Sequence, residues 1–354
     1  MEIFKYPRDK EGIEKRRLKN TFDFQDERSR VVEEIIKSVK VEGDQALFKY
    51  TKDFDGAELA SLQVSPEEIE EAYQLVGEDY LSSLRRSIEN VASFHEKQLR
   101  KSWFAYEGGT VGQLFIPLAR VGAYVPGGRA AYPSSVVMTV VPARVAGVEE
   151  VVVVSPPDSD GKLNPYTLVA ARETGADEIY KVGGAQAIAA LALGTETIPR
   201  VDKIVGPGNI FVTLAKKLVF GLVDIDMLAG PSEILILADE TANPDFIAAD
   251  LLSQAEHDPL AVSTLITTDE NLAQRTLAAV KDQLESLPKR EIASTSLENN
   301  GSIIIVEDLQ AGIEQVNLFA PEHFELMVAE PLKYLGEIKN AGAIFIGEYS
   351  SEPL

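Results

Sequence analysis

The sequence predicts an α/β fold in which two blocks of mostly parallel β-sheet follow an N-terminal helical region. Three observations support this prediction. From about residue 111, short β-branched runs alternate with helical segments, which is typical of βαβ units. The first 105 residues are instead charge-rich, with apolar residues at helical spacing. The length of 354 residues suggests about two domains.

The N-terminal region is expected to be helical. Its clearest periodic stretch places five apolar residues at helical spacing: Val31, Val32, Ile35, Ile36 and Val39. The run from Ser65 through Pro66 to Glu68 predicts a helix start, because serine caps a helix, proline suits its first position and glutamate its third. A further helix is expected over about residues 78–100, and His95 on it is expected at the solvated surface.

The first α/β block contains four predicted strands, each followed by a helix. The strands are expected over residues 120–125, 151–154, 178–182 and 203–205, and the helices begin near residues 133, 164, 185 and 209. The four valines at 151–154 are typical of a strand buried on both faces of a sheet. Glycine-containing turns join three of these strands to their helices, as in a parallel sheet.

The second α/β block begins with a strand predicted over residues 234–237. Further strands are expected over residues 261–267, 302–306 and 343–346, and helices over residues 244–257, 270–284 and 313–319. Because the two blocks are similar in kind, we expect two related half-domains.

The charge and the cysteine content exclude several functions. The chain has 34 basic and 56 acidic residues, and its net charge of −22 argues against nucleic acid or an anionic membrane as a partner. It has no cysteine, so it contains no disulfide, thiolate nucleophile, Cys-type zinc site or iron–sulfur cluster. Any metal must therefore use nitrogen and oxygen ligands. The only three histidines are His95, His257 and His323.

The N-terminal sequence and the hydropathy pattern predict a cytoplasmic protein. The first 20 residues have no apolar stretch of about 7–15 residues, so no secretory signal is predicted. No apolar run approaches the roughly 18 residues that cross a bilayer.

Three strand–turn–helix joints carry paired glycines: Gly127 and Gly128, Gly183 and Gly184, and Gly206 and Gly208. Glycine lets a backbone approach a ligand closely, and the helix behind it offers free N–H groups to an anion. In an open parallel sheet, such turns line the carboxyl edge, where ligands bind. The fingerprint G-x-G-x-x-G with a downstream acid is absent, so a standard Rossmann site is not predicted. Tight turns without a ligand are the alternative interpretation.

Gln254 and His257 are candidate metal ligands. They stand three residues apart near the end of a predicted helix, and this spacing puts both side chains on one face. The alternative is a histidine placed favourably at a helix C-terminus, with Gln254 solvated.

Glu322 and His323 form a second candidate site. They follow Pro321, which disfavours helix at Ala320 and predicts a loop or strand edge. Adjacent side chains diverge there, so a carboxylate and an imidazole could serve two proton transfers around one substrate. A surface loop pair is the alternative.

Six segments, in order and in spacing along nearly the whole chain, resemble the histidinol dehydrogenase family. They are VGAYVPGG at residues 121–128, VGGAQAIA at 182–189, GPGN at 206–209, DMLAGPSE at 226–233, QAEHD at 254–258 and APEH at 320–323. The resemblance implies a zinc-dependent, NAD-linked enzyme of histidine biosynthesis. Such an enzyme oxidises L-histidinol to L-histidine through L-histidinal, with two hydride transfers and two NAD per turnover.

The resemblance also assigns roles to particular residues. It implies that NAD is contacted by Tyr124, Gln186 and Asn209. It implies that substrate is bound by Ser232, Gln254, His257 and His323, and that the zinc ligands include Gln254 and His257. His323 would be the general base, and Glu322 would activate the water that attacks the aldehyde. Since the chain has no cysteine for a thioester, this aldehyde step requires a hydrate.

The resemblance implies a homodimer and a fold of two incomplete Rossmann-like domains. We expect an N-terminal helical region at residues 1–105. The first Rossmann-like domain, with the metal and catalytic loop, is expected at residues 106–123 and 234–354. The second, with the NAD-binding turns, is expected at residues 124–233.

Family members continue beyond the position of Leu354. The resemblance implies that an aspartate and a histidine in that continuation bind zinc, and that the tail reaches into the neighbouring subunit. We therefore expect an incomplete zinc site, a weakened dimer and impaired catalysis as one alternative. The others are a related NAD-dependent alcohol dehydrogenase with another substrate, and a non-catalytic binding protein of the same fold.

Overall fold

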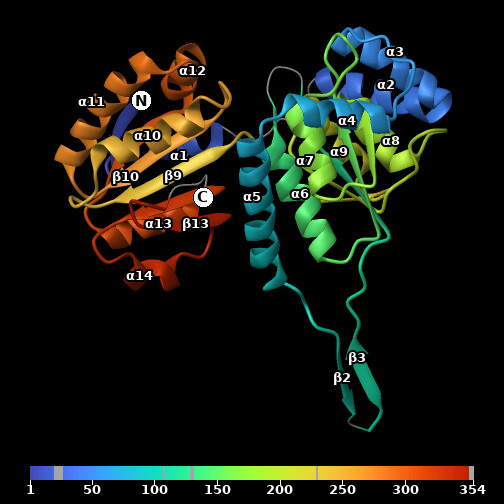
Figure 1. Cartoon of the computed structure of the whole chain (residues 1–354). Helices are drawn as coiled ribbons and strands as arrows, with labels where there is room; N and C mark the ends of the chain where they lie inside the picture. The colour runs from blue at the N-terminus through green and yellow to red at the C-terminus, as the bar shows by residue number, and fades with distance from the viewer. Residues whose placement is uncertain (20–26, 107, 128–130, 229, 351–354) are drawn as a thin grey trace. The chain divides into compact units, whose positions relative to one another are not determined.

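The computed structural model describes residues 1–19, 27–106, 108–127, 131–228 and 230–350. The chain divides into two compact units (Figure 1). Unit 1 comprises Met1–Phe22 and Gly230–Leu354, and unit 2 comprises Asp23–Ala229. Each unit has its own parallel sheet, which confirms the predicted α/β class with two mostly parallel sheets.

Unit 1 is built on a six-stranded sheet in the order β1-β11-β10-β9-β12-β13, with every pairing parallel. The strands are β1 (Glu2–Lys5), β9 (Glu233–Ala238), β10 (Val262–Thr267), β11 (Ser302–Ile305), β12 (His323–Met327) and β13 (Ala343–Ile346). The helices are α1 (Lys10–Lys19), α10 (Pro244–Ala255), α11 (Glu270–Ser286), α12 (Arg290–Asn300), α13 (Leu309–Phe319), α14 (Pro331–Tyr334) and the 3₁₀-helix η1 (Leu335–Glu337).

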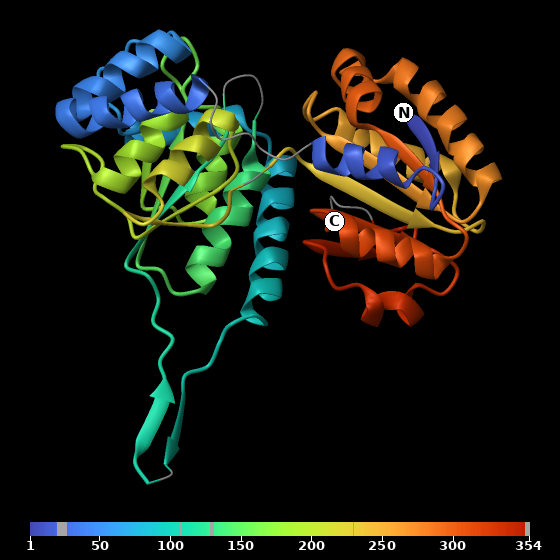
Figure 2. The same ribbon diagram turned by 180° about the vertical axis from the view of Figure 1, so that it is seen from behind.

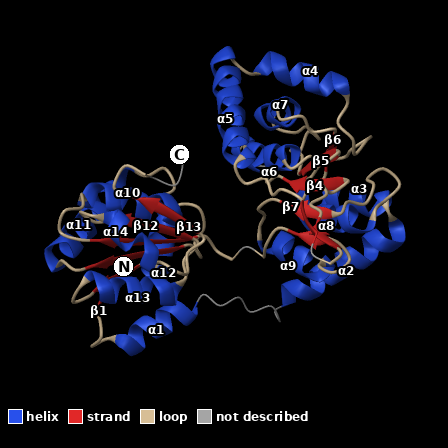
Figure 3. Ribbon diagram, turned by 90° about the horizontal axis from the view of Figure 1, so that it is seen from below, coloured by secondary structure: helices blue, strands red, loops and turns tan. Residues whose placement is uncertain are grey.

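Helices cover both faces of this sheet (Figure 3). The central strand β9 shows why both faces must be covered, because its residues 234–237 are apolar and face the two sides of the sheet alternately. Ile234 and Ile236 join the buried cluster that includes residues of α10, α11 and α12. Leu235 and Leu237, on the opposite face of the strand, join the cluster that includes α13.

Unit 2 is built on a five-stranded parallel sheet in the order β6-β5-β4-β7-β8, with a separate hairpin of β2 and β3. The strands are β2 (Trp103–Tyr106), β3 (Thr110–Gln113), β4 (Arg120–Tyr124), β5 (Glu150–Ser155), β6 (Glu178–Lys181), β7 (Lys203–Val205) and β8 (Asp224–Ile225). The helices are α2 (Glu27–Glu42), α3 (Asp44–Asp55), α4 (Pro66–Leu75), α5 (Glu78–Glu96), α6 (Pro133–Val145), α7 (Pro165–Glu173), α8 (Gly184–Leu193) and α9 (Ile210–Val219).

The predicted N-terminal helices form, but they are not a separate region. The apolar stripe of α2, with Val32, Ile35 and Val39, is buried in one cluster with Ile188 and Leu191 of α8. Helices α4 and α5 likewise belong to unit 2, and α4 begins at the predicted capping box. An amphipathic helix has no core of its own. These helices therefore bury their apolar faces against the helices that cover the five-stranded sheet.

The strand ladders also correct the expected domain boundaries. Residues 106–123, expected in one domain with residues 234–354, include most of β4, which pairs with β5 and β7 of unit 2. The N-terminal β1, expected to be helical, pairs with β11 as an edge strand of unit 1. In both cases the hydrogen-bonded partner lies far away in the sequence, and local periodicity does not identify it.

Several further elements were not predicted. They include the hairpin β2–β3, the strand β8, the helices α12 and α14, the 3₁₀-helix η1 and the full strand β12. Helix α10 ends at Ala255, two residues before the expected end at His257. Among the residues that the structure describes, no helix has the length and apolar character needed to cross a membrane.

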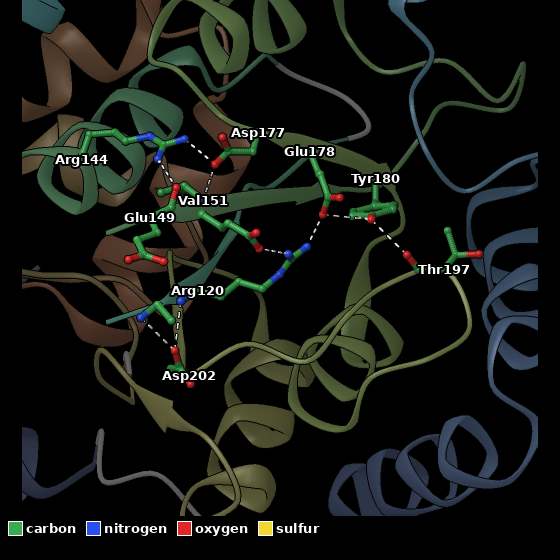
Figure 4. Close-up of polar contacts among 11 residues, drawn as sticks. Arg120, Arg144, Glu149, Val151, Asp177, Glu178, Tyr180, Thr197 and Asp202 are labelled. Atoms are coloured by element: carbon green, nitrogen blue, oxygen red, sulfur yellow. Dashed lines mark hydrogen bonds and ion pairs between the residues drawn. The ribbon is translucent and has the colours of Figure 1, made fainter. Parts of the chain in front are cut away.

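Ion pairs tie together the amino edge of the unit 2 sheet (Figure 4). The guanidinium of Arg120, at the start of β4, contacts Glu150 at the start of β5 and Glu178 at the start of β6. The Tyr180 hydroxyl contacts Glu178 and donates to the Thr197 carbonyl at 3.0 Å. Structural contacts therefore occupy this edge, and the glycine turns lie at the opposite, carboxyl edge.

Candidate active-site residues

Tyr124 connects two of the glycine turns at the carboxyl edge of the unit 2 sheet. It ends β4, and its hydroxyl accepts the Gly184 N–H at 3.2 Å. A Cβ at Gly206, which has a φ of 109°, would overlap the Tyr124 carbonyl oxygen. Burial raises the pKa of Tyr124 to about 12. The sheet order reverses direction between β4 and β7, so Tyr124 lies where open α/β sheets bind ligands.

Gln186 lies beside the same turn. Its side chain is 1% exposed, and its Oε1 has no hydrogen-bond partner among the residues that the structure describes. A Cβ built on Gly184 would stand 2.7 Å from this oxygen. A buried acceptor without a donor is costly, so the position favours a ligand that supplies a donor.

Chain packing accounts for part of the glycine pattern. A Cβ at Gly183 would overlap Pro156, and one at Gly127 would lie 2.9 Å from the Pro156 carbonyl oxygen. The interpretation of tight turns therefore applies to these two positions. Gly128, predicted with Gly127, lies outside the described residues.

Asn209 has a structural role in addition to its predicted one. Its Oδ1 caps α9 by accepting the N–H groups of Phe211 at 3.0 Å and Val212 at 3.2 Å. With this oxygen engaged, the amide nitrogen is the group left to donate to a ligand. Asn209 follows the Gly206 turn, so it belongs to the same edge of the sheet as Tyr124.

The sequence interpretation missed two residues that hold this turn, Lys216 and Asp226. The Lys216 Nζ contacts the Gly206 carbonyl, and Asp226 accepts the Gly206 N–H. One signal could have found them: Lys216 is a lysine inside an otherwise apolar helical stretch, and such a residue needs an acidic partner when it is buried.

In unit 1, the structure brings His323 and Gln254 together. His323 begins β12, and its Nδ1 lies 3.2 Å from the Oε1 of Gln254 in the last turn of α10. Gln254 is buried and His323 is half-buried. The contact joins positions 69 residues apart in the chain.

Two carboxyl groups lie beside this pair. The Glu322 Oε2 accepts the Glu233 N–H at 3.3 Å, and β12 pairs with β9 at His323 and Ile234. Burial, and then the negative charge of Glu322, raise the pKa of the Glu233 carboxyl. Ser232 directly precedes Glu233 and is half-buried. The predicted residues Ser232, Gln254, Glu322 and His323 therefore gather at one edge of the sheet.

His257 differs from its partner Gln254 in its surroundings. It lies in the turn after α10, its N–H donates to the Gln254 carbonyl at 3.2 Å, and its side chain is exposed. The prediction of one shared helical face is corrected, because the helix ends at Ala255.

These residues do not by themselves fit a zinc ion. Gln254 and His257 offer one amide oxygen and one imidazole nitrogen, whereas zinc sites in proteins use three or four protein ligands. Within the described part of the chain, no group of three His, Cys, Asp or Glu side chains could hold a metal.

A cavity lies at the carboxyl edge of the unit 1 sheet. It has a volume of about 380 Å³, and its lining includes Thr241, Met327, Gly347 and Tyr349. The residues that gather around His323 stand at the other, amino edge of the same strands. The rule that ligands bind at carboxyl ends of strands therefore points away from them.

The comparisons with known proteins agree with the sequence motifs. The family model for histidinol dehydrogenase matches residues 18–354. The curated histidinol dehydrogenase of Moorella thermoacetica is 58% identical over 327 residues, which cover 91% of this chain and 77% of the relative. That of Bacillus subtilis is 54% identical over 346 residues, which cover 97% of this chain and 81% of the relative. The crystal structure of histidinol dehydrogenase from Elizabethkingia anophelis matches with a TM-score of 0.94 and 38% identity, covering 100% of this chain and 82% of that chain.

The two parallel sheets define an α/β protein with two Rossmann-like units, because the strand order reverses at β9 in unit 1 and at β4 in unit 2. The polar cluster at His323 and the glycine turns at Tyr124 are the candidate sites of such a protein. The chain belongs to the histidinol dehydrogenase family, whose members are oxidoreductases of histidine biosynthesis.

Proposed function

We propose that this chain oxidises L-histidinol to L-histidine through L-histidinal, with two NAD per turnover. The observation that carries the proposal is the contact between His323 and Gln254 beside Glu322, in a member of the histidinol dehydrogenase family. An imidazole and a carboxylate from adjacent positions provide the two proton-transfer groups that successive oxidations of an alcohol and an aldehyde require.

Unit 2 is the proposed NAD-binding unit, and its residues fit a dinucleotide. The buried Gln186 Oε1 has no partner among the described residues and would accept a hydrogen bond from the ligand. Tyr124 and Asn209 border the same turns. NAD, when bound, supplies the hydride acceptor.

His323 is the proposed general base. When its Nδ1–H donates to the Gln254 Oε1, Nε2 carries the lone pair and can accept the proton of the substrate alcohol. Gln254 thereby fixes both the tautomer and the orientation of the ring.

Glu322 is the proposed base for the aldehyde step. Its carboxylate accepts one proton from water as the water oxygen attacks the aldehyde carbon, and it returns that proton to the former carbonyl oxygen, which yields the hydrate. This route agrees with the sequence, because the chain has no cysteine to form a thiohemiacetal. The hydrate then loses a hydride from carbon and a proton from oxygen, and the product is the carboxylic acid.

We further propose that Ser232 and His257 contact the substrate and that the protein forms a homodimer. Gln254 and His257 stay the proposed ligands of a zinc ion. No step of the mechanism is assigned to zinc, since the described residues do not complete its ligand set.

The test is NADH formation from L-histidinol by the purified chain with added zinc. We expect His323→Gln to lower turnover on the order of 10²–10⁴-fold, as is typical when a general base is removed. The affinity for NAD, measured by calorimetry, should not change. His95→Gln is the matched control, because His95 lies on α5 of unit 2, where its Nδ1 is 2.7 Å from the Gln98 Oε1. Absence of histidinol-dependent NADH from the unaltered chain contradicts the proposal.

A further inference from the structure

The hairpin arm, which we define as residues 97–106 and 108–118, carries a strand pair that is separate from the five-stranded sheet of unit 2. Within the described ranges, its strands β2 and β3 pair with each other and with no further strand, from Trp103 opposite Gln113 to Tyr106 opposite Thr110. Figures 1 and 2 show the hairpin extending from the end of α5, away from the five-stranded sheet of its unit. An isolated two-stranded hairpin is marginally stable in water, so this arm needs a further contact.

The arm exposes apolar side chains in both strands and in the segment after them. Each of the following is more than half exposed: Trp103, Phe104, Tyr106, Val111, Leu114 and Ile116. Successive strand residues face opposite sides, so both faces of the hairpin present large apolar groups. Apolar patches of this kind mark interaction sites, and Trp and Tyr are enriched at the centres of interfaces.

The charge of the arm is opposite to that of the chain. Residues 97–106 and 108–118 contain three basic residues, Lys97, Arg100 and Lys101, and no acidic residue, a net charge of +3. The chain as a whole has a net charge of −22. A second copy of this chain is therefore an acidic partner that complements the arm, whereas a nucleic acid would be repelled by the remainder of the molecule.

We propose that the hairpin arm packs against a second copy of this chain. The proposal rests on the proposed homodimer and identifies a segment that forms its interface. A stable interface uses about 20–30 residues on each side, and the arm provides 21 positions. In a two-fold dimer each copy contributes one arm, so the apolar contact is made twice.

The single tryptophan makes the proposal measurable. Trp103 is the only tryptophan of the chain and lies in the arm. We expect the unaltered protein to sediment as a dimer, with the Trp103 emission shifting to longer wavelength on dilution as the dimer dissociates. High salt should weaken the dimer, because the arm is basic and the partner is acidic.

The test variant is Tyr106→Glu together with Ile116→Glu. Both side chains are more than three-quarters exposed, so the substitutions leave the fold of one copy unchanged. The dimer dissociation constant should rise on the order of tenfold or more. Val41→Glu is the control, because Val41 is 83% exposed on α2 of the same unit. Circular dichroism and urea unfolding verify that each variant folds.

Three outcomes overturn the proposal. In the first, the double variant dissociates no more readily than Val41→Glu, while the dimer itself persists. In the second, the protein is a monomer with Trp103 in an apolar environment, which means that the arm packs within one chain. In the third, added RNA shifts the Trp103 emission without a change in oligomeric state. None of these outcomes depends on histidinol turnover, so failure of the proposed activity is distinguishable from failure of the interface.

Discussion

The Lys216 ammonium and the Asp226 carboxylate together hold one residue of the cofactor turn. The Lys216 Nζ lies 2.7 Å from the Asp226 Oδ1 and 2.5 Å from the Gly206 carbonyl oxygen. The Asp226 Oδ2 accepts the Gly206 N–H at 2.7 Å. Both backbone polar groups of Gly206 are thus satisfied by one ion pair. Asn209 follows three residues later, so the pair fixes the start of the segment that is proposed to contact NAD.

Replacement of Lys216 tests this relationship. Lys216→Met removes a cation whose side chain is 5% exposed, and the Gly206 carbonyl and the Asp226 carboxylate both lose this donor. We expect a loss of about 2 kcal/mol in the free energy of unfolding and a several-fold weaker affinity for NAD. Urea unfolding and calorimetry measure the two effects.

The control for Lys216 is a neighbouring but more exposed ion pair. Lys203 of β7 contacts Asp224 of β8 at 2.8 Å, with side-chain exposures of 32% and 54%. Lys203→Met should cost less than about 1 kcal/mol and leave NAD binding unchanged. Equal effects of the two substitutions contradict a specific role of Lys216 in the turn.

A substitution at Gly184 tests whether the position of the Gln186 side chain matters for NAD binding. Gly184→Ala introduces a Cβ 2.7 Å from the Gln186 Oε1, at a φ of 63°. We expect a loss of about 1–3 kcal/mol of stability from backbone strain and a weaker affinity for NAD because Gln186 must move. Isothermal calorimetry with NAD is the measurement.

The matched control is Gly221→Ala, which isolates the backbone strain. Gly221 has a φ of 98°, and a Cβ there meets nothing within 4 Å. This variant should lose stability and retain the affinity for NAD. If both variants bind NAD like the unaltered chain, Gln186 has no part in the site.

The partly buried carboxyl of Asp55 should make the stability of the protein depend on pH. Burial raises the pKa of its carboxyl from 3.8 to about 6, and its Oδ2 has no hydrogen-bond partner among the described residues. The folded state therefore favours the protonated form, and the free energy of unfolding falls as pH rises from about 4 to about 6. Asp55→Asn should remove this loss and stabilise the protein by about 1–2 kcal/mol above pH 6, allowing for partial solvent screening.

Urea unfolding at several pH values measures the effect. The difference between Asp55→Asn and the unaltered chain should shrink as pH falls below about 4, where the carboxyl is protonated in both states. Asp53→Asn is the control, because Asp53 is an exposed residue of the same helix. A constant difference across this range rules out titration of Asp55 as the cause.

Sequence patterns predicted the elements that are stabilised by interactions between residues close together in the chain. The valines of β5 and the capping box at Ser65 act through near neighbours in the chain, and the structure has both features as expected. Pairing partners far apart in the sequence were not predictable in this way. The ladder between Glu2 and Ser302 depends on the assembled sheet, and the short strand β1 has no distinctive pattern.

The candidate site shows the same division. The motifs named the residues, and the spacing of Gln254 and His257 predicted a shared helical face. The structure instead pairs Gln254 with His323, because strand β12 begins beside the last turn of α10. This contact depends on the order of the strands in the sheet. That order cannot be deduced from the spacing of two residues in the sequence. Lys216 and Asp226 were missed for the same reason, since their direct contact joins α9 to the residue that follows β8 and forms only in the folded unit.

The pairing of β1 with β11 has a consequence for synthesis of the chain. Unit 1 takes its first strand from Glu2–Lys5 and the rest of its sheet from residues after 230, so all of unit 2 is made in between. As the chain leaves the ribosome, β1 has no sheet to join until β11 has been translated. Unit 2 can complete its sheet earlier, because its strands are contiguous in the sequence. Strand β1 therefore emerges before the rest of its sheet and is incorporated late, and the loop that its pairing closes spans about 300 residues.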